Sequence, residues 1–163
     1  KKKDKLASII TVIVTLVSFV SLLQLQHGSF GIYYLLDLEL TLLKVDRLSL
    51  LFGYLFHLAA FIASIYAFHI NDRVQQVAAL LYTGSALGAV FAGDWITLFI
   101  FWELLALTSV FLILARRTRE SFLSSMRYLV MQVLSGVLLF SGALMIASHS
   151  GTAAITALVL IPD

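Results

Sequence analysis

Cysteine is absent from this sequence, and proline occurs once, at Pro162. Without cysteine, the chain itself offers no disulfide bond, zinc-thiolate site or iron–sulfur ligand. Charged residues are scarce as well, because they make up 12% of the 163 residues, against roughly 25% in a soluble domain. The net charge of +2 is divided among short clusters, so the sequence gives no reason to expect a nucleic acid as a partner.

Apolar residues dominate instead. They make up 61% of the sequence, and the mean hydropathy is +1.00. The sequence contains no phosphate loop, no nucleotide fingerprint and no Ser/His/Asp constellation, and no two histidines have metal-ligand spacing on one face. We therefore expect an integral membrane protein without a cofactor or a metal site. Whether it forms part of an enzyme stays open at this point.

Long apolar runs define the predicted fold. A bilayer core about 30 Å thick requires about 20 apolar residues per spanning helix. Five segments meet this requirement, and they predict helices over residues 6–26, 48–68, 74–92, 95–115 and 122–147. The expected fold class is all-α, a polytopic transmembrane helix bundle that forms one domain over residues 1–163. A further apolar run at 153–161 begins like a sixth helix but is too short to span.

The segment between the first two helices has a different pattern. In residues 28–47, leucines at 36, 38, 40 and 42 alternate with Asp37, Glu39 and Thr41. Alternation with a period of two is typical of a strand with one apolar face. We predict a short amphipathic strand or extended segment on the membrane surface.

Basic residues predict the orientation. They gather at Lys1–Lys5, at Arg73 and at Arg116–Arg119, and five spans place these three sites on one side. The positive-inside rule assigns that side, and with it the N-terminus of this segment, to the cytoplasm. Residues 28–47 and the Gly93–Asp94 turn then lie outside.

Glu103 is the strongest candidate for a functional residue. It is the only ionisable residue between Trp95 and Ala115. A charged side chain at the bilayer centre costs roughly 2.5–3.5 kcal/mol on insertion scales, and nothing in the local sequence offsets this cost. Glu103 is either a structural, hydrogen-bonded carboxyl or a group that handles protons or ions, and we favour the second. A movable cationic partner would switch its protonation.

Two further residues are candidates for the same chemistry. His57 lies near the middle of the second span, where it is either a candidate proton relay or a hydrogen-bonded packing residue. Arg127, about two turns into the fifth helix, either extends to the membrane interface or turns inward as a candidate charge partner of Glu103. Asp94, just before the fourth helix, is expected to be its N-cap, with an ion-access site as the alternative.

Glycines are expected to serve helix packing. Gly84 and Gly88 form a small-xxx-small pattern in the third helix, and Gly136 and Gly142 are similar small residues in the fifth. Such positions let neighbouring helices approach closely. We therefore interpret them as packing positions of the bundle.

Three stretches of the chain carry a family resemblance. They are VDRLSLLF at 45–52, GSALGAVFAGDWITLFIFWELLALTSVFLI at 84–113, and RRTRESFLSSMRYLVMQVLSGVLLFSGALMI at 116–146. An FWEL motif after an AGD turn, followed by RRT…RY…Q on the next helix, is specific in combination. The sequence resembles the antiporter-like membrane subunits shared by Mrp-type sodium/proton antiporters and the proton-pumping arm of respiratory complex I, and looks closest to the Mrp D subunit.

This resemblance implies a fold of about fourteen transmembrane helices with two inverted repeats. The family's helix-embedded glutamate falls on Glu103, and in the family it pairs with a lysine on a later helix. Charge switching in that pair is linked to sodium exchange or to quinone reduction. Neither the family's first helix nor its lysine helix is in this sequence. We therefore expect the N-terminal portion of a longer chain.

The leading hypothesis is a subunit of a Na⁺/H⁺ antiporter in a bacterial cell membrane, which moves protons through Glu103. The first alternative is a proton-translocating subunit of an NADH:quinone oxidoreductase or a membrane-bound hydrogenase. The second is a non-catalytic scaffold of helices. Expected partners are other membrane subunits, the lipid bilayer, protons and Na⁺.

Overall fold

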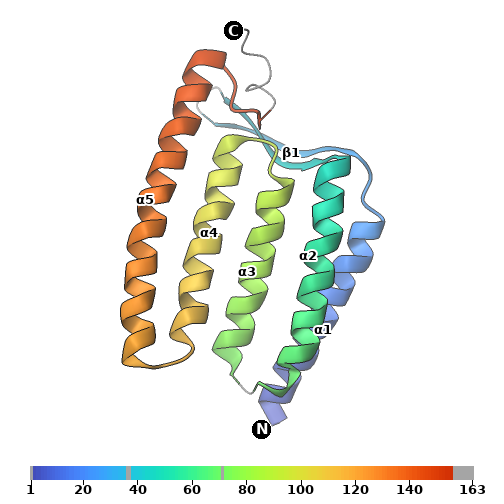
Figure 1. Ribbon diagram of the computed structural model, residues 1–163. Helices are drawn as coiled ribbons and strands as arrows, with labels where there is room; N and C mark the ends of the chain where they lie inside the picture. Colours follow the sequence, from blue (N-terminus) through green and yellow to red (C-terminus); the bar gives the residue numbers. More distant parts are fainter. Residues whose placement is uncertain (1, 36–37, 71, 156–163) are drawn as a thin grey trace.

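The computed structural model describes residues 2–35, 38–70 and 72–155. Its described part contains five α-helices, which stand side by side, and one β-hairpin, which crosses one end of them (Figure 1). The helices are α1 Lys2–Leu23, α2 Arg47–Tyr66, α3 Arg73–Phe91, α4 Trp95–Leu114 and α5 Arg119–Ser150, with a short 3₁₀ helix Ala67–His69 after α2. The strands are β1 Gly28–Leu35 and β2 Leu38–Val45.

The predicted transmembrane helix bundle is confirmed. Four helices, α2 to α5, are long and apolar enough to cross a membrane. The helix α1 has 22 residues, and the part of it with described side chains, Ser8–Leu23, is apolar as well. The chain is a multi-pass membrane protein.

Side-chain caps begin four of the helices. The residues Asp46, Asp72, Asp94 and Thr118 stand before α2, α3, α4 and α5, and each accepts a hydrogen bond from a backbone N–H of the first turn. Such a cap stabilises a helix by about 0.5–2 kcal/mol. The hydrogen bond from the Ser49 backbone holds the pKa of Asp46 below its ordinary value. Asp94 is therefore confirmed as an N-cap.

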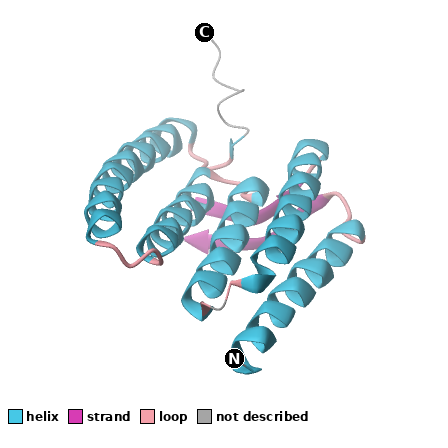
Figure 2. Cartoon of the chain, turned by 60° about the horizontal axis from the view of Figure 1, so that its bottom comes forward, coloured by secondary structure: helices cyan, strands magenta, loops and turns pink. Residues whose placement is uncertain are grey.

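The hairpin confirms the predicted strand and adds a second one. β1 and β2 pair antiparallel from Gly28↔Val45 to Leu35↔Leu38, and the pair lies across the helix ends (Figure 2). On β2, Leu40 and Val45 are buried and Glu39 is exposed. The predicted alternation at Leu36 and Asp37 lies outside the described residues, as do 156–161 of the apolar run after α5.

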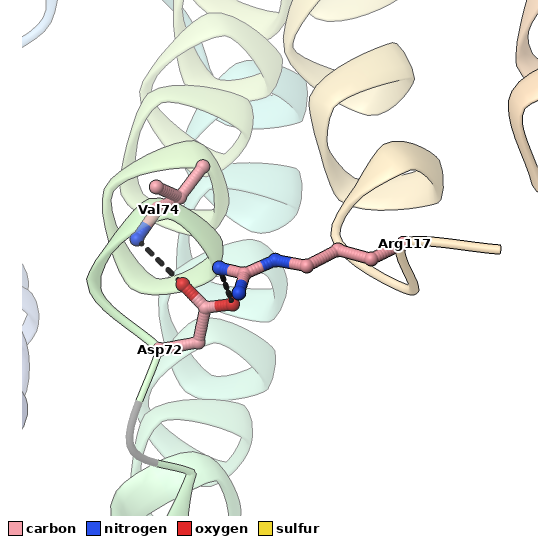
Figure 3. A network of polar contacts seen from close by, with 3 residues as sticks. All are labelled: Asp72, Val74 and Arg117. Carbon is pink, nitrogen blue, oxygen red and sulfur yellow. Dashed lines mark hydrogen bonds and ion pairs between the residues drawn. The ribbon is translucent and has the colours of Figure 1, made fainter.

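The three basic sites lie at one end of the bundle. The start of α1, the α2–α3 connection and the α4–α5 connection share this end, which we call the basic end (Figure 1). There, the Arg117 guanidinium lies 2.8 Å from a carboxylate oxygen of Asp72 and joins the two connections (Figure 3). The shared side is as predicted, and its assignment to the cytoplasm stays a prediction.

Two of the four predicted packing glycines lie where another side chain needs the space. A Cβ at Gly88 would overlap the ring of Phe101 on α4, and one at Gly136 would overlap the carboxyl of Glu103. At Gly84 and Gly142, no atom of another described residue outside the adjoining helix backbone lies within 4 Å of the corresponding point. Close approach therefore occurs at one glycine of each pair.

Candidate functional site

Glu103 lies halfway along α4, on the side that meets α5. Its Oε1 atom is buried and has no hydrogen-bond partner among the described residues. The carboxyl occupies the space that a side chain at Gly136 would need. The absence of a side chain at Gly136 therefore leaves room for the carboxyl between α4 and α5. No described residue makes a hydrogen bond to its Oε1 atom.

Two contacts between α4 and α5 enclose this position. Toward the hairpin, the rings of Phe99 and Phe140 lie with centroids 4.8 Å apart. Toward the basic end, the Ser109 hydroxyl lies 2.9 Å from the Tyr128 hydroxyl. Phe99 and Ser109 stand about 6 Å and 9 Å from Glu103 along the helix axis, at a rise of about 1.5 Å per residue. The carboxyl is therefore held in a short section of interface that is packed on both sides.

Arg127 is not part of this section. Its side chain is exposed, and it lies about 13 Å along α5 from Gly136 at a rise of about 1.5 Å per residue. No ion pair joins it to Glu103, both being in the described part of the chain. Its neighbour Tyr128 contacts α4 instead, because adjacent helical residues point about 100° apart. The sequence predicted Gly136 as a packing position but did not predict that it would meet Glu103, and it did not predict the contact of Tyr128 with α4, although the spacing of eight residues puts the two on one face of α5.

His57 is buried at 5% exposure between α1 and α2. Its Nδ1 lies 2.8 Å from the Gly53 carbonyl oxygen, and its Nε2 lies 2.8 Å from the Ser18 hydroxyl. Because a carbonyl oxygen only accepts, Nδ1 carries the hydrogen and donates it to Gly53. In the neutral ring, Nε2 then accepts from Ser18. These bonds fit both hypotheses for His57, the relay and the packing residue.

The three candidates lie in different places. Glu103 stands between α4 and α5, His57 between α1 and α2, and α3 separates the two pairs (Figure 1). Arg127 lies on the exposed side of α5. The described residues contain no group of three or more His, Asp or Glu side chains that would hold a metal ion.

Asp94 is a buried carboxylate whose partners are structural. It is 1% exposed, and its Oδ1 accepts from the Thr97 backbone N–H at 2.7 Å. Its Oδ2 accepts from the Thr97 hydroxyl at 2.7 Å and from the Thr41 backbone N–H at 2.8 Å. Asp94 therefore caps α4 and ties β2 to it, and these bonds account for the burial of its charge.

Residues 92–162 match the family described as "NADH:quinone oxidoreductase/Mrp antiporter, TM". A putative antiporter subunit mnhA2 of Staphylococcus epidermidis is 31% identical over 128 residues, which are 74% of this chain and 16% of that protein. The protein of the same name in Staphylococcus saprophyticus is 30% identical over 162 residues, 94% of this chain and 20% of that protein.

A solved structure supports the fold. The chain is similar to a chain of the membrane-bound sulfane sulfur reductase, an archaeal respiratory membrane complex, with a TM-score of 0.70 and 20% identity. The match covers 98% of this chain and 34% of that chain. This chain therefore spans about a fifth of the two curated relatives and a third of the structural one. The expected likeness to the Mrp D subunit in particular stays a prediction, since the relatives described here are called mnhA2.

Proposed function

Because the chain belongs to the family of Mrp antiporter and complex I-like membrane subunits, we propose that it forms part of a cation/proton antiporter subunit in which Glu103 carries protons. The cation exchanged for the proton is Na⁺, and the protein lies in a bacterial cell membrane with the basic end in the cytoplasm. The observation that carries this proposal is the buried, unpartnered Oε1 of Glu103 in the middle of an apolar helix.

The energetics of this carboxyl support a change of protonation. Keeping it ionised at the bilayer centre costs roughly 2.5–3.5 kcal/mol. A cation that approaches to 4 Å attracts it by about 4 kcal/mol at an effective dielectric constant of about 20. The two energies are similar, so a cation that moves toward Glu103 or away from it is sufficient to switch the group between its two forms.

We assign the positively charged partner of Glu103 to a residue outside this chain. Arg127, the candidate partner within the chain, lies about 13 Å away along α5 at a rise of about 1.5 Å per residue. Reaching Glu103 would require α5 to slide or turn relative to α4, against the Ser109–Tyr128 and Phe99–Phe140 contacts. In the family that the sequence resembles, this glutamate pairs with a lysine on a later helix, and we expect such a lysine in the whole subunit. Other membrane subunits are expected as partners because the relatives are named as subunits or come from a membrane complex.

The test replaces Glu103 with Gln in the complete subunit and complex. Gln keeps the size of the side chain and removes its titratable proton. We expect Glu103→Gln to abolish Na⁺/H⁺ exchange in inside-out vesicles while the complex assembles normally, and Glu103→Asp to keep part of the exchange. Normal exchange by Glu103→Gln would refute the proposed role, and normal exchange by Glu103→Ala would favour the scaffold hypothesis.

A second candidate function is proton translocation in a redox-driven complex. It is favoured by the fold similarity to a respiratory membrane complex over 98% of this chain. In this case the native complex would co-purify with flavin- or iron–sulfur-containing subunits. Sodium-linked exchange by a purified complex without redox partners would exclude it.

A further inference from the structure

A groove lies between α3 and α4 in the half of the bundle near the basic end. Its volume is about 390 Å³, within the range of roughly 300–1,000 Å³ that is usual for ligand pockets. Gln76 of α3 bonds Ser8 of α1, and Ala78, which lines the groove, stands about 200° around the helix from it at about 100° per residue. The groove therefore lies on the side of α3 away from α1.

The groove has a buried floor and exposed apolar walls. The least exposed lining residues, Ala78 at 5% and Thr108 at 7%, form the floor. Val77, Leu81 and Phe111, which also line the groove, are each more than half exposed. The Thr108 hydroxyl donates to backbone carbonyls of its own helix, so it offers no hydrogen to a ligand in the groove. The lining therefore fits an alkyl chain.

The length of the groove matches one leaflet of a membrane. Its lining residues on α3 extend from Arg73 to Leu81, which is about 12 Å at a rise of about 1.5 Å per residue. The hydrocarbon core of a bilayer is about 30 Å thick, so one leaflet is about 15 Å deep. An acyl chain whose headgroup lies at Arg73 would therefore contact the groove over most of its depth in the membrane.

Positive charge gathers at the basic end of the groove. Arg73 lines the groove, and Val74 beside it donates its backbone N–H to Asp72 at 3.0 Å. Asp72 in turn pairs with Arg117 from the α4–α5 connection (Figure 3). Because this pair is neutral in sum, the exposed Arg73 and Arg116 leave an excess of positive charge among these residues.

This combination is complementary to a phospholipid with a negative charge. Guanidinium groups bind phosphate through paired N–H donors. Arginines next to a membrane attract anionic lipids, and basic pockets between transmembrane helices hold their headgroups. Apolar contact alone would not select one lipid, because lipid tails are as apolar as leucine. The charge therefore selects the headgroup, and the groove determines where the acyl chain lies.

We propose that the groove between α3 and α4 is a binding site for one anionic phospholipid of the leaflet at the basic end. Its phosphate lies against Arg73, and one acyl chain occupies the groove between the walls formed by Leu81 and Phe111. The positive charge of Arg116 adds to the attraction. This proposal requires only that the chain spans a membrane, so it is independent of ion exchange and of the role of Glu103.

The first experiment images the complete complex by cryo-electron microscopy in nanodiscs. They contain equal parts of phosphatidylglycerol, which is anionic, and phosphatidylcholine, which is zwitterionic, and the acyl chains of one lipid at a time carry bromine. We expect bromine density in the groove with brominated phosphatidylglycerol and much less with brominated phosphatidylcholine. Equal density with the two lipids, an empty groove, or a helix or side chain of the complex in the groove would overturn the proposal.

The second experiment removes one positive charge. Arg73→Gln removes it at the groove, and the control Arg119→Gln removes it at the same end of the bundle, at the start of α5. One arginine near the membrane surface favours an anionic lipid by about fivefold. We therefore expect the preference of the groove for phosphatidylglycerol to fall about fivefold in Arg73→Gln and to stay near wild type in Arg119→Gln. The same preference in both variants would overturn the proposal.

The third experiment fills the floor of the groove. Ala78→Leu places a larger side chain there and is expected to displace the acyl chain. Thr108→Val is the control, because it keeps the shape of the floor and should keep the acyl chain. Unchanged density in Ala78→Leu, or lost density in Thr108→Val, would overturn the proposal. If Ala78→Leu prevents assembly of the complex, the first two experiments decide the question without it.

Discussion

Replacing Gly136 with Ala is a direct test of the site around Glu103. The added methyl group would lie where the Glu103 carboxyl lies now, so one of the two has to move. The carboxyl either rotates away from α5 or pushes the helices apart. The atom that has to move is the far end of a flexible side chain, so the carboxyl gives way first, in a section of the interface bounded by the Phe99–Phe140 and Ser109–Tyr128 contacts.

The magnitude follows from two opposing effects. Overpacking a closely packed contact costs typically about 1–3 kcal/mol. Exchange of a helical glycine for alanine stabilises the helix by roughly 0.5–1 kcal/mol. Gly136→Ala is therefore expected to destabilise the subunit by up to about 2 kcal/mol on balance. Gly142→Ala on the same helix keeps only the helix gain, because no side chain of the described residues lies within 4 Å of the new methyl group.

The assay combines thermal unfolding of the purified complex with Na⁺/H⁺ exchange in vesicles. Gly136→Ala is expected to lower the midpoint of unfolding and to reduce exchange, and Gly142→Ala to leave exchange unchanged. Shortening the carboxylate side chain makes room for the methyl group. The double variant Gly136→Ala with Glu103→Asp is therefore expected to be more stable than the sum of the single changes predicts.

Two results would refute this reasoning. One is a Gly136→Ala complex with the stability and exchange rate of Gly142→Ala, because the carboxyl would then not occupy the position described. The other is strict additivity of the double variant, since two residues in direct contact are expected to be coupled.

Two predictions concern the caps at the hairpin side of the bundle. Asp94→Ala removes the acceptor of three hydrogen bonds, each worth about 1.5–3 kcal/mol when the acceptor is charged. Faster hydrogen exchange of the β2 backbone amides is therefore expected. The control Asp72→Ala removes a single cap bond at the other end of the bundle and should leave exchange in β2 unchanged. Unchanged exchange in both variants would contradict the tie between β2 and α4. The pKa of Asp46 is lower in the folded protein than in the unfolded chain. Its contribution to the free energy of unfolding is therefore complete above the unfolded-state pKa of about 3.9, and it is lost as the pH falls through the folded-state pKa. Acid unfolding measured below about pH 4 should therefore be less steep in Asp46→Asn, and an identical acid profile would show that the cap contributes nothing.

Features that depend on the local sequence pattern, such as helix ends, were predicted well. Each observed helix end lies within four residues of its predicted position. Apolar runs and capping residues define these limits, and both are visible in the sequence. The strand over residues 38–45 followed from its alternation, but its pairing with residues 28–35 did not, because β1 has no comparable alternation of polar residues. Glu103 was identifiable because hydropathy makes a lone carboxylate conspicuous.

What depends on helix rotation was less predictable. Arg127 and Tyr128 are neighbours in the sequence, and the rotation of α5 decides which of them contacts α4. Serine and threonine recur on one face of α1 at Ser8, Thr11, Thr15 and Ser18, yet they hardly change hydropathy, so the apolar pattern does not reveal them. The buried Oε1 atom of Gln76 has no hydrogen-bond partner among the described residues, because the amide nitrogen reaches the Ile70 carbonyl, and only the folded chain shows this.

The two bonds that Asp94 makes at its Oδ2 atom have a consequence for any motion of the Glu103 carboxyl. Glu103 stands nine residues after Asp94 on one unbroken helix, about 13 Å away at a rise of about 1.5 Å per residue. The helix acts as a stiff rod over that length, and its first turn is fastened to β2 through Thr41. A neighbouring protein that shifted the hairpin would therefore turn α4 and swing the Glu103 carboxyl relative to Gly136. The carboxyl would then move without any direct contact to that protein.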